Sequence, residues 1–86
     1  MDKRPVDVIV YGAEWCAFCH VAMDYLKGKK VEYKYIDIDK DPKAGQDIYH
    51  KTGQAGVPVI QIGDETILGF DRPRIDSALR ANNLVS

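Results

Sequence analysis

The chain has 86 residues, which suits a single domain over residues 1–86. Twelve basic and thirteen acidic residues leave a formal net charge of −1, so the composition offers no broad basic field for nucleic acid. No apolar run approaches the ~20 residues that a membrane helix needs, and no export signal is evident. We therefore expect a cytoplasmic protein without nucleic-acid or membrane partners, in a compartment that keeps thiols reduced.

The first half of the chain predicts a strand, a helix and a second strand. Residues 6–11 (VDVIVY) are mostly β-branched and apolar, as in a strand buried on both faces. Apolar residues then recur at helical spacing from Cys16 to about residue 27, with Gly28 placed as a C-terminal cap. Residues 31–38 (VEYKYIDI) alternate like a strand. Two strands joined through a helix should lie parallel with a right-handed crossover.

The second half predicts a helix, a hairpin and a last helix. Asp41 is placed as the N-cap of a helix that Gly53 ends. Residues 57–62 (VPVIQI) predict a strand, and a short Gly-Asp turn joins it to a return strand over residues 65–68. Residues 71–83 then form the last helix. The result is an α/β domain with a mixed sheet and helices on both faces.

Cys16 and Cys19 are the only cysteines, and they stand three residues apart in the stretch EWCAFCH. This spacing places both on one helix face, close enough for a reversible disulfide. Cys16 falls at the start of the helix, where unpaired N–H groups and the helix dipole stabilise a thiolate. Cys16 is therefore the predicted nucleophile, and the deeper Cys19 the predicted resolving thiol. His20 either supports that thiolate as an imidazolium or faces solvent.

Other readings of the cysteine pair remain open from the residues alone. C-x-x-C-H is also the pattern for c-type haem attachment, which needs an export signal. A zinc site needs four ligands, and His20 and His50 are the only histidines left, at a spacing that fits no finger. The pair could also hold an iron–sulfur cluster shared between two chains, act as a redox sensor, or be inert core. Redox exchange is favoured, with no metal and no bound cofactor.

The motifs together resemble the glutaredoxin-like redoxins of the thioredoxin superfamily, from about residue 6 to residue 84. The matching segments are W-C-A-F-C at the strand-to-helix turn, G-V-P-V-I before the hairpin and G-F-D after it. The resemblance implies a thioredoxin fold, with a four-stranded mixed sheet in the order 2-1-3-4 flanked by three helices. It also implies a cis bond before Pro58 facing Cys16, rather than a trans proline at the start of an edge strand.

The resemblance further implies a substrate-binding surface around the cysteines. The backbone of Val57 would pair with an extended substrate segment beside the sulfur. Trp15, Phe18 and Phe70 would form an apolar docking surface around it, unless Trp15 and Phe70 simply cover the sheet edges. Asp71 would belong to the turn that holds a glutathione carboxylate in related proteins. Trp15, Phe18, Val57, Pro58, Phe70 and Asp71 are thus the predicted substrate-binding residues.

The implied activity is that of a monomeric dithiol oxidoreductase that reduces protein or small-molecule disulfides. Its electrons would come from thioredoxin reductase or from a low-molecular-weight thiol such as glutathione. Three departures weaken the predicted glutathione site. Ala13 replaces a lysine, Gly56 replaces a threonine, and Phe70 replaces the second glycine of a Gly-Gly pair. Each lost contact is worth on the order of 1 kcal/mol.

Two further resemblances bear on the reductant. The Gly-Phe pair is similar to redoxins that supply ribonucleotide reductase and are recharged by thioredoxin reductase. The C-x-x-C-H motif is similar to that of mycoredoxins, which act on mycothiol mixed disulfides. Together with the three departures, the Gly-Phe pair predicts faster recycling by thioredoxin reductase than by glutathione.

Overall fold

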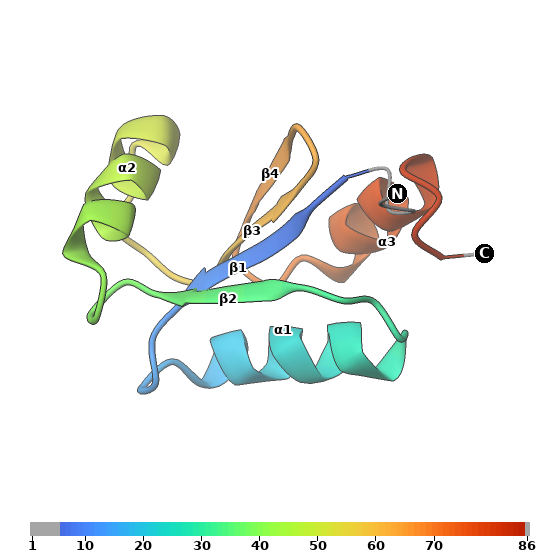
Figure 1. Cartoon of the computed structure of the whole chain (residues 1–86), viewed down its shortest axis with the longest axis horizontal. Coiled ribbons are helices and arrows are strands. Elements are labelled where there is room, and N and C mark those ends of the chain that lie inside the picture. The colour runs from blue at the N-terminus through green and yellow to red at the C-terminus, as the bar shows by residue number, and fades with distance from the viewer. Residues whose placement is uncertain (1–5, 86) are drawn as a thin grey trace, which may run out of the picture.

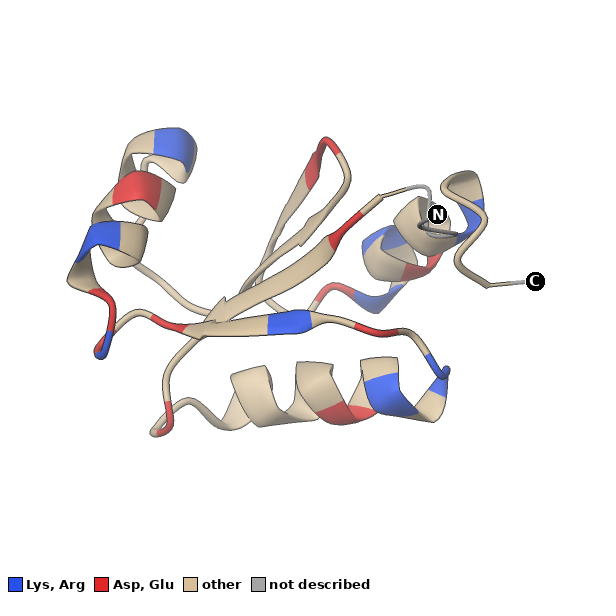
Figure 2. Cartoon of the chain, in the orientation of Figure 1, with Lys and Arg blue, Asp and Glu red and all other residues tan. Residues whose placement is uncertain are grey.

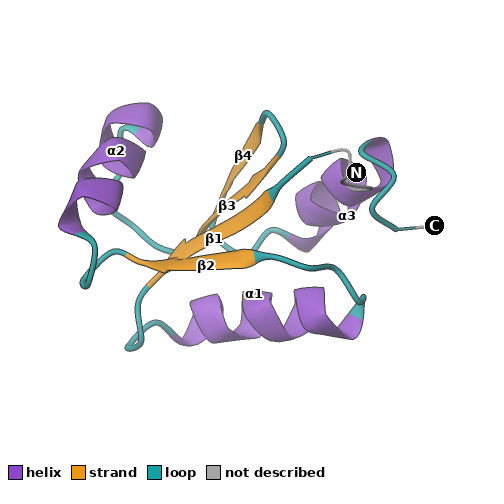
Figure 3. Ribbon diagram, viewed as in Figure 1, coloured by secondary structure: helices purple, strands orange, loops and turns teal. Residues whose placement is uncertain are grey.

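The computed structural model describes residues 6–85. A four-stranded sheet runs through the middle, with helices on both sides of it (Figures 1 and 3). The order of elements along the chain is the predicted one. In that order they are β1 (Val8–Gly12), α1 (Ala17–Gly28), β2 (Lys34–Asp37), α2 (Pro42–Thr52), β3 (Val59–Ile62), β4 (Glu65–Leu68) and α3 (Arg72–Ala81).

The sheet has the strand order β2-β1-β3-β4, which confirms the predicted order 2-1-3-4. β1 and β2 are parallel, as their connection through α1 requires, whereas β3 runs antiparallel to both β1 and β4. The peptide bond between Val57 and Pro58 is cis, as predicted. It lies immediately before β3, at the end of the sheet where β1 finishes.

Several element ends differ from the sequence prediction. Three strands begin two or three residues later than expected, at Val8, Lys34 and Val59. β3 starts after Pro58 because proline has no N–H to offer the strand ladder. Gly28 is the last residue of α1 rather than its cap, and the chain reverses at Lys30, which has a φ of 61°.

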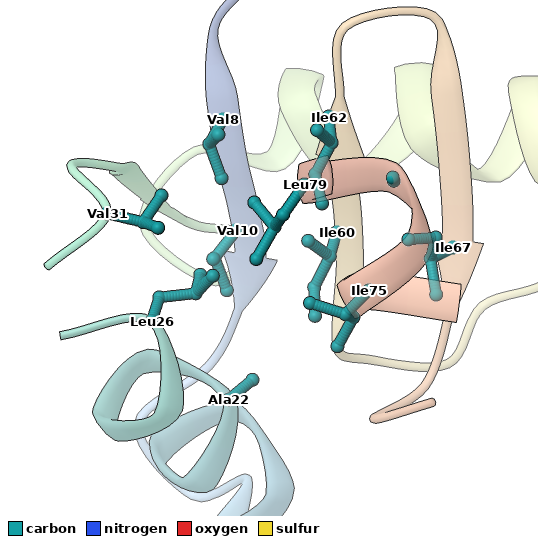
Figure 4. Close-up of a cluster of buried hydrophobic side chains, with 11 residues drawn as sticks. Val8, Val10, Ala22, Leu26, Val31, Ile60, Ile62, Ile67, Ile75 and Leu79 are labelled. Atoms are coloured by element: carbon teal, nitrogen blue, oxygen red, sulfur yellow. The ribbon is translucent and has the colours of Figure 1, made fainter. Parts of the chain in front are cut away.

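One face of the sheet carries the main hydrophobic core. Alternate residues of β1 and β3 point to this face, where α1 and α3 cover them (Figure 4). Figure 4 shows α3 in front of the strands and α2 behind them. The buried residues of this cluster are Val8, Val10, Ala22, Leu26, Val31, Ile60, Ile62, Ile67, Ile75, Ala78 and Leu79.

The opposite face is covered in part by α2. Tyr11 follows Val10 in β1 and therefore points away from the main core. The carboxylate of Asp47 in α2 lies near enough to raise the pKa of Tyr11, although burial is the larger cause of that rise. The sheet is thus the middle of three layers.

The helix ends follow the capping rules that the sequence indicated. Asp41 accepts a hydrogen bond from the Ala44 N–H at 3.2 Å, which confirms it as the N-cap of α2. Gly53 ends that helix with a φ of 75°, a left-handed conformation that glycine adopts without strain. Within residues 6–85, no helix has the length and apolar character that crossing a membrane requires.

Candidate active site

The two cysteines lie at the carboxyl end of β1, where the chain turns into α1 (Figure 1). Cys16 is buried and Cys19 has no exposed surface. Together with Ala13 they form a small buried cluster, separate from the main core. Val57, the residue before the cis bond, packs against this cluster. The structure therefore brings three of the predicted site residues together.

Cys16 is the N-cap of α1 and uses its sulfur as the capping acceptor. Its backbone is extended, with φ −90° and ψ 105°, so the helix begins at Ala17 rather than at Cys16. The N–H of Cys19 donates to the Cys16 sulfur at 3.2 Å. The Cys19 thiol also makes a side-chain hydrogen bond with Cys16. A backbone N–H directed at a sulfur at a helix N-terminus is a geometry that favours negative charge there.

The environment of Cys19 favours the opposite state. Burial raises the pKa of the Cys19 thiol to about 12, and the hydrogen bond with Cys16 is the next largest cause. The negative charge of Asp37 raises this pKa further, while a backbone hydrogen bond at Ala13 opposes the rise. Cys19 is therefore a thiol at neutral pH. The two sulfurs thus lie in different environments: Cys16 accepts a hydrogen bond at the helix N-terminus, and Cys19 is a buried thiol.

Gly12 is needed for this packing, and the sequence analysis did not single it out. A Cβ placed on Gly12 would lie 2.8 Å from the Cys19 sulfur and 3.0 Å from the Cys19 Cβ. Both distances are well below ordinary van der Waals contact. The signal in the sequence was a glycine closing an apolar strand just before the cysteine motif, which often marks a close approach.

Two placements are predicted for His20, beside the Cys16 sulfur or facing solvent, and the structure shows the exposed one. Its side chain is exposed, and its Nε2 lies 2.8 Å from the backbone carbonyl of Glu14. A carbonyl oxygen only accepts, so Nε2 carries the proton in this bond. His20 therefore ties the first turn of α1 to the loop that precedes Cys16.

Two aromatic side chains stand exposed beside the cysteines. The indole of Trp15 is 71% exposed and the ring of Phe18 is 65% exposed. The Nε1–H of Trp15 donates to the Asp39 carboxylate at 2.8 Å, which fixes one edge of the ring.

Phe70 and Asp71 do not belong to the cluster of buried residues around the cysteines. The Phe70 ring is partly buried against the main core and meets the Tyr25 ring edge-on, with centroids 5.6 Å apart. Asp71 accepts from the Arg74 N–H at 3.3 Å and caps α3. Pro58 is buried, and its carbonyl accepts from the Gly69 N–H at 2.8 Å, which ties the cis bond to the turn before α3.

Tyr35 is a second residue at the site that the sequence analysis missed. Its ring edge would lie 3.2 Å from a Cβ on Gly12, so it flanks the same small space as the Cys19 sulfur. Its hydroxyl oxygen is buried and has no hydrogen-bond partner in the described part of the chain. Burial raises the pKa of Tyr35, with a smaller contribution from the negative charge of Asp37.

The next question is whether the fold places metal ligands near the two cysteines. Residues 6–85 contain no group of three or more His, Cys, Asp or Glu side chains arranged to hold a metal ion. A cluster at Cys16 and Cys19 would need its other ligands from a second chain or from a free thiol.

Comparisons with known proteins agree with this geometry. The sequence profile of the glutaredoxin family matches residues 8–67. An uncharacterized glutaredoxin-like 8.6 kDa protein from the rubredoxin operon of Clostridium pasteurianum is 30% identical over 70 residues, which cover 81% of this chain and 93% of that protein. A glutaredoxin of Pseudomonas aeruginosa is 33% identical, over 74% of this chain and 76% of its own length.

Solved structures extend the likeness to three dimensions. The crystal structure of a glutaredoxin from Archaeoglobus fulgidus superimposes with a TM-score of 0.79 at 28% identity, and the match covers 87% of each chain. With the family profile spanning the strands, the cysteine motif and the hairpin, the chain belongs to the glutaredoxin family of thiol–disulfide oxidoreductases, with Cys16 and Cys19 as its C-x-x-C pair.

Proposed function

We propose that the protein is a dithiol oxidoreductase that reduces protein or small-molecule disulfides, with Cys16 as nucleophile and Cys19 as resolving thiol. The observation that carries this proposal is the difference between the environments of the two sulfurs. The Cys16 sulfur accepts from the Cys19 N–H at 3.2 Å, whereas burial raises the pKa of the Cys19 thiol to about 12 and keeps it protonated. A reactive thiolate next to a protected thiol is the arrangement that two-step exchange needs.

In the first step the Cys16 thiolate attacks one sulfur of a substrate disulfide. A new S–S bond joins Cys16 to the substrate, and the other substrate sulfur leaves as a thiolate. That departing thiolate takes up a proton. The negative charge on Cys16 is consumed, which removes one cause of the raised pKa of Cys19.

In the second step Cys19 loses its proton and attacks the Cys16 sulfur. The bond between Cys16 and the substrate breaks, the second substrate sulfur leaves as a thiol, and Cys16 and Cys19 end as a disulfide. Two electrons have passed from the protein to the substrate. A reductase or a low-molecular-weight thiol then returns two electrons and restores the dithiol.

The substrate segment is proposed to lie between the cis turn and the exposed aromatic pair. Val57 packs on the cysteine cluster, so its backbone is within reach of a chain bonded to Cys16. Trp15 and Phe18 offer an apolar surface on the helix side. Phe70 and Asp71 keep their proposed role only if a substrate extends from Pro58 to the start of α3.

Thioredoxin reductase is the proposed electron donor, in preference to glutathione. Ala13 occupies the position of the lysine found in glutathione-dependent relatives, and it is fully buried against the cysteines. No side chain at this position offers a cation to a glutathione carboxylate. A monomer in the cytoplasm, where reductases and small thiols are available, completes the proposal.

The proposal is tested by measuring reduction of insulin and of hydroxyethyl disulfide. Wild-type protein should turn over both substrates, and Cys16→Ser should reduce neither. Cys19→Ser should accumulate a mixed disulfide with the substrate, visible as an added mass. Equal rates for wild type and Cys16→Ser would reject the proposal. Parallel recycling with glutathione plus its reductase and with thioredoxin reductase then identifies the donor, and the second arm should be faster.

A further inference from the structure

We infer that the preferred substrates are protein disulfides flanked by lysine or arginine, docked on Trp15 and on an acidic rim beside it. This inference names a substrate class for the activity proposed above and rests on it. The acidic rim consists of the carboxylates of Glu14, Asp37, Asp39 and Asp41. Glu14 stands two residues before the proposed nucleophile, and the cleft it lines also contains Trp15, the neighbour of Cys16.

The acidic rim comes from two connections that are distant in sequence and adjacent in space. Glu14 lies in the β1–α1 loop, and the three aspartates lie at the end of β2 and in the β2–α2 connection. Glu14, Trp15, Asp37, Asp39 and Lys40 line a surface cleft of about 510 Å³. A neighbouring cleft of about 370 Å³ shares Glu14, Asp37 and Lys40 and adds Asp41.

Three carboxylates of the acidic rim accept hydrogen bonds from uncharged donors. Asp37 accepts from the backbone N–H groups of Asp39 and Lys40, and Asp41 accepts from that of Ala44. Asp39 accepts from the Trp15 indole. All these donors are neutral, so each bond orders a carboxylate without cancelling its charge.

A single basic side chain, Lys40, lines the two clefts within the described chain. It approaches Glu14 at 3.5 Å, with both side chains largely exposed. Exposed ion pairs of this kind are weak and easily exchanged for another partner. A net negative surface therefore remains beside Cys16.

Trp15 adds a second feature that attracts cations. Its indole N–H is held by Asp39, so the ring is oriented while 71% of its surface stays open. The face of a tryptophan ring binds lysine and arginine side chains through cation–π contacts. A basic residue next to a substrate cysteine could lie on this face with its charge directed toward the Asp39 and Glu14 carboxylates.

The described charges differ between the two ends of α1 in the sense that this docking requires. Figure 2 shows mostly acidic residues in the two connections at the cysteine end, and basic residues together with some acidic ones around the far end of α1. Lys27, Lys30 and Lys34 line the cleft at that far end, together with Asp7 and Glu32. The formal net charge of −1 hides this separation. Such a field orients a basic partner during its approach.

A protein side chain is a better occupant than a metal ion. The carboxylates of the acidic rim belong to no metal-binding group of three or more ligands among residues 6–85. Glutathione is disfavoured too, because it carries two carboxylates and one ammonium group. A lysine or arginine brings one positive charge and a long apolar stem, which suit the carboxylates and the indole face together.

The test compares three synthetic pentapeptides that differ only in charge. Each peptide has blocked termini and a central cysteine between two alanines, and it carries the same residue at both ends: lysine, glutamine or glutamate. Each peptide is oxidised to its symmetric disulfide dimer. The rate at which the protein reduces each dimer is divided by the rate at which dithiothreitol, a neutral thiol, reduces the same dimer. This ratio removes differences in the intrinsic reactivity of the dimers. We expect wild type to reduce the lysine dimer about fivefold faster than the glutamine dimer at about 0.01 M salt, where the Debye length is ~30 Å. At about 1 M salt, where it is ~3 Å, the ratio should approach one.

Matched variants locate the effect. Glu14→Gln combined with Asp39→Asn removes two charges and keeps both hydrogen-bonding shapes, and the lysine-to-glutamine ratio should fall toward one. Asp64→Asn combined with Glu65→Gln removes the same charge at the β3–β4 hairpin and should leave the ratio unchanged. Equal normalised rates for the three dimers, or a faster glutamate dimer, would overturn the inference while leaving the oxidoreductase proposal intact. No turnover of any dimer by wild type would instead count against the oxidoreductase itself.

Discussion

The tight contact between Gly12 and Cys19 gives the sharpest prediction for stability. In Gly12→Ala the new Cβ would meet the Cys19 sulfur at 2.8 Å and the Cys19 Cβ at 3.0 Å, with the Tyr35 ring edge at 3.2 Å. Carbon and sulfur contacts normally begin near about 3.5 Å, so β1 or α1 has to move by roughly 0.7 Å. Cys19 is fully buried, which leaves its side chain little freedom to turn aside.

The cost of this change can be bounded from general values. Overpacking by one methyl group costs about 1–3 kcal/mol, and the loss of glycine's freedom in the unfolded chain returns about 0.4–1 kcal/mol. We expect a net loss of about 1–2 kcal/mol in the free energy of unfolding. With a urea m-value of about 1 kcal/mol per M, the unfolding midpoint should fall by about 1–2 M.

Gly28→Ala is the matched control for this experiment. A Cβ at Gly28 would have no neighbour within 4 Å, and the residue is helical. Alanine should raise stability there by up to about 1 kcal/mol, because it is the better helix former. Urea unfolding of the reduced proteins, followed by circular dichroism, measures both changes. A Gly12→Ala midpoint equal to that of wild type, with the expected rise for Gly28→Ala, would refute the packing of Cys19 against β1.

Four further predictions concern residues around the cysteine pair. Burial raises the pKa of Cys19 from 9.0 to about 12, so iodoacetamide at pH 8 should add one group per reduced chain, at Cys16. Peptide mapping that finds Cys19 equally labelled would contradict this. The Cys19 thiol ionises near pH 9.0 in the unfolded chain but only near 12 in the folded one, so the folded state becomes less stable as the pH rises from 9 to 12. The free energy of unfolding of the reduced protein should fall by up to about 1.4 kcal/mol per pH unit in this range. Cys19→Ser should lack that loss. Tyr35→Phe removes a buried hydroxyl that has no hydrogen-bond partner among residues 6–85. It should leave the free energy of unfolding equal or raise it by about 1 kcal/mol, and a clear fall would contradict the lack of a partner at that oxygen. Trp15→Ala should change the free energy of unfolding by less than about 0.5 kcal/mol, since the ring is exposed, yet slow insulin reduction while sparing hydroxyethyl disulfide. Equal slowing on both substrates would argue against a docking role for the indole.

The fold was largely readable from local patterns. A β-branched run ending at Gly12, helical periodicity after Cys16 and the turn between Ile62 and Glu65 each depend on residues close in sequence. The strand order and the cis bond before Pro58 came from the resemblance, and the structure agrees with both. The ends of strands were less predictable, because they depend on which residues find a partner strand.

The sequence by itself determined the cysteine pair, its place at the start of a helix and the order of elements, because these features depend on neighbours a few residues apart. Only the tertiary structure brought Gly12 and Tyr35 against Cys19 and buried that thiol enough to hold it protonated. It alone placed Phe70 on Tyr25, and it gathered Glu14 with three aspartates from another connection. Composition reports a net charge, whereas a field at the active site depends on where the fold places each charge.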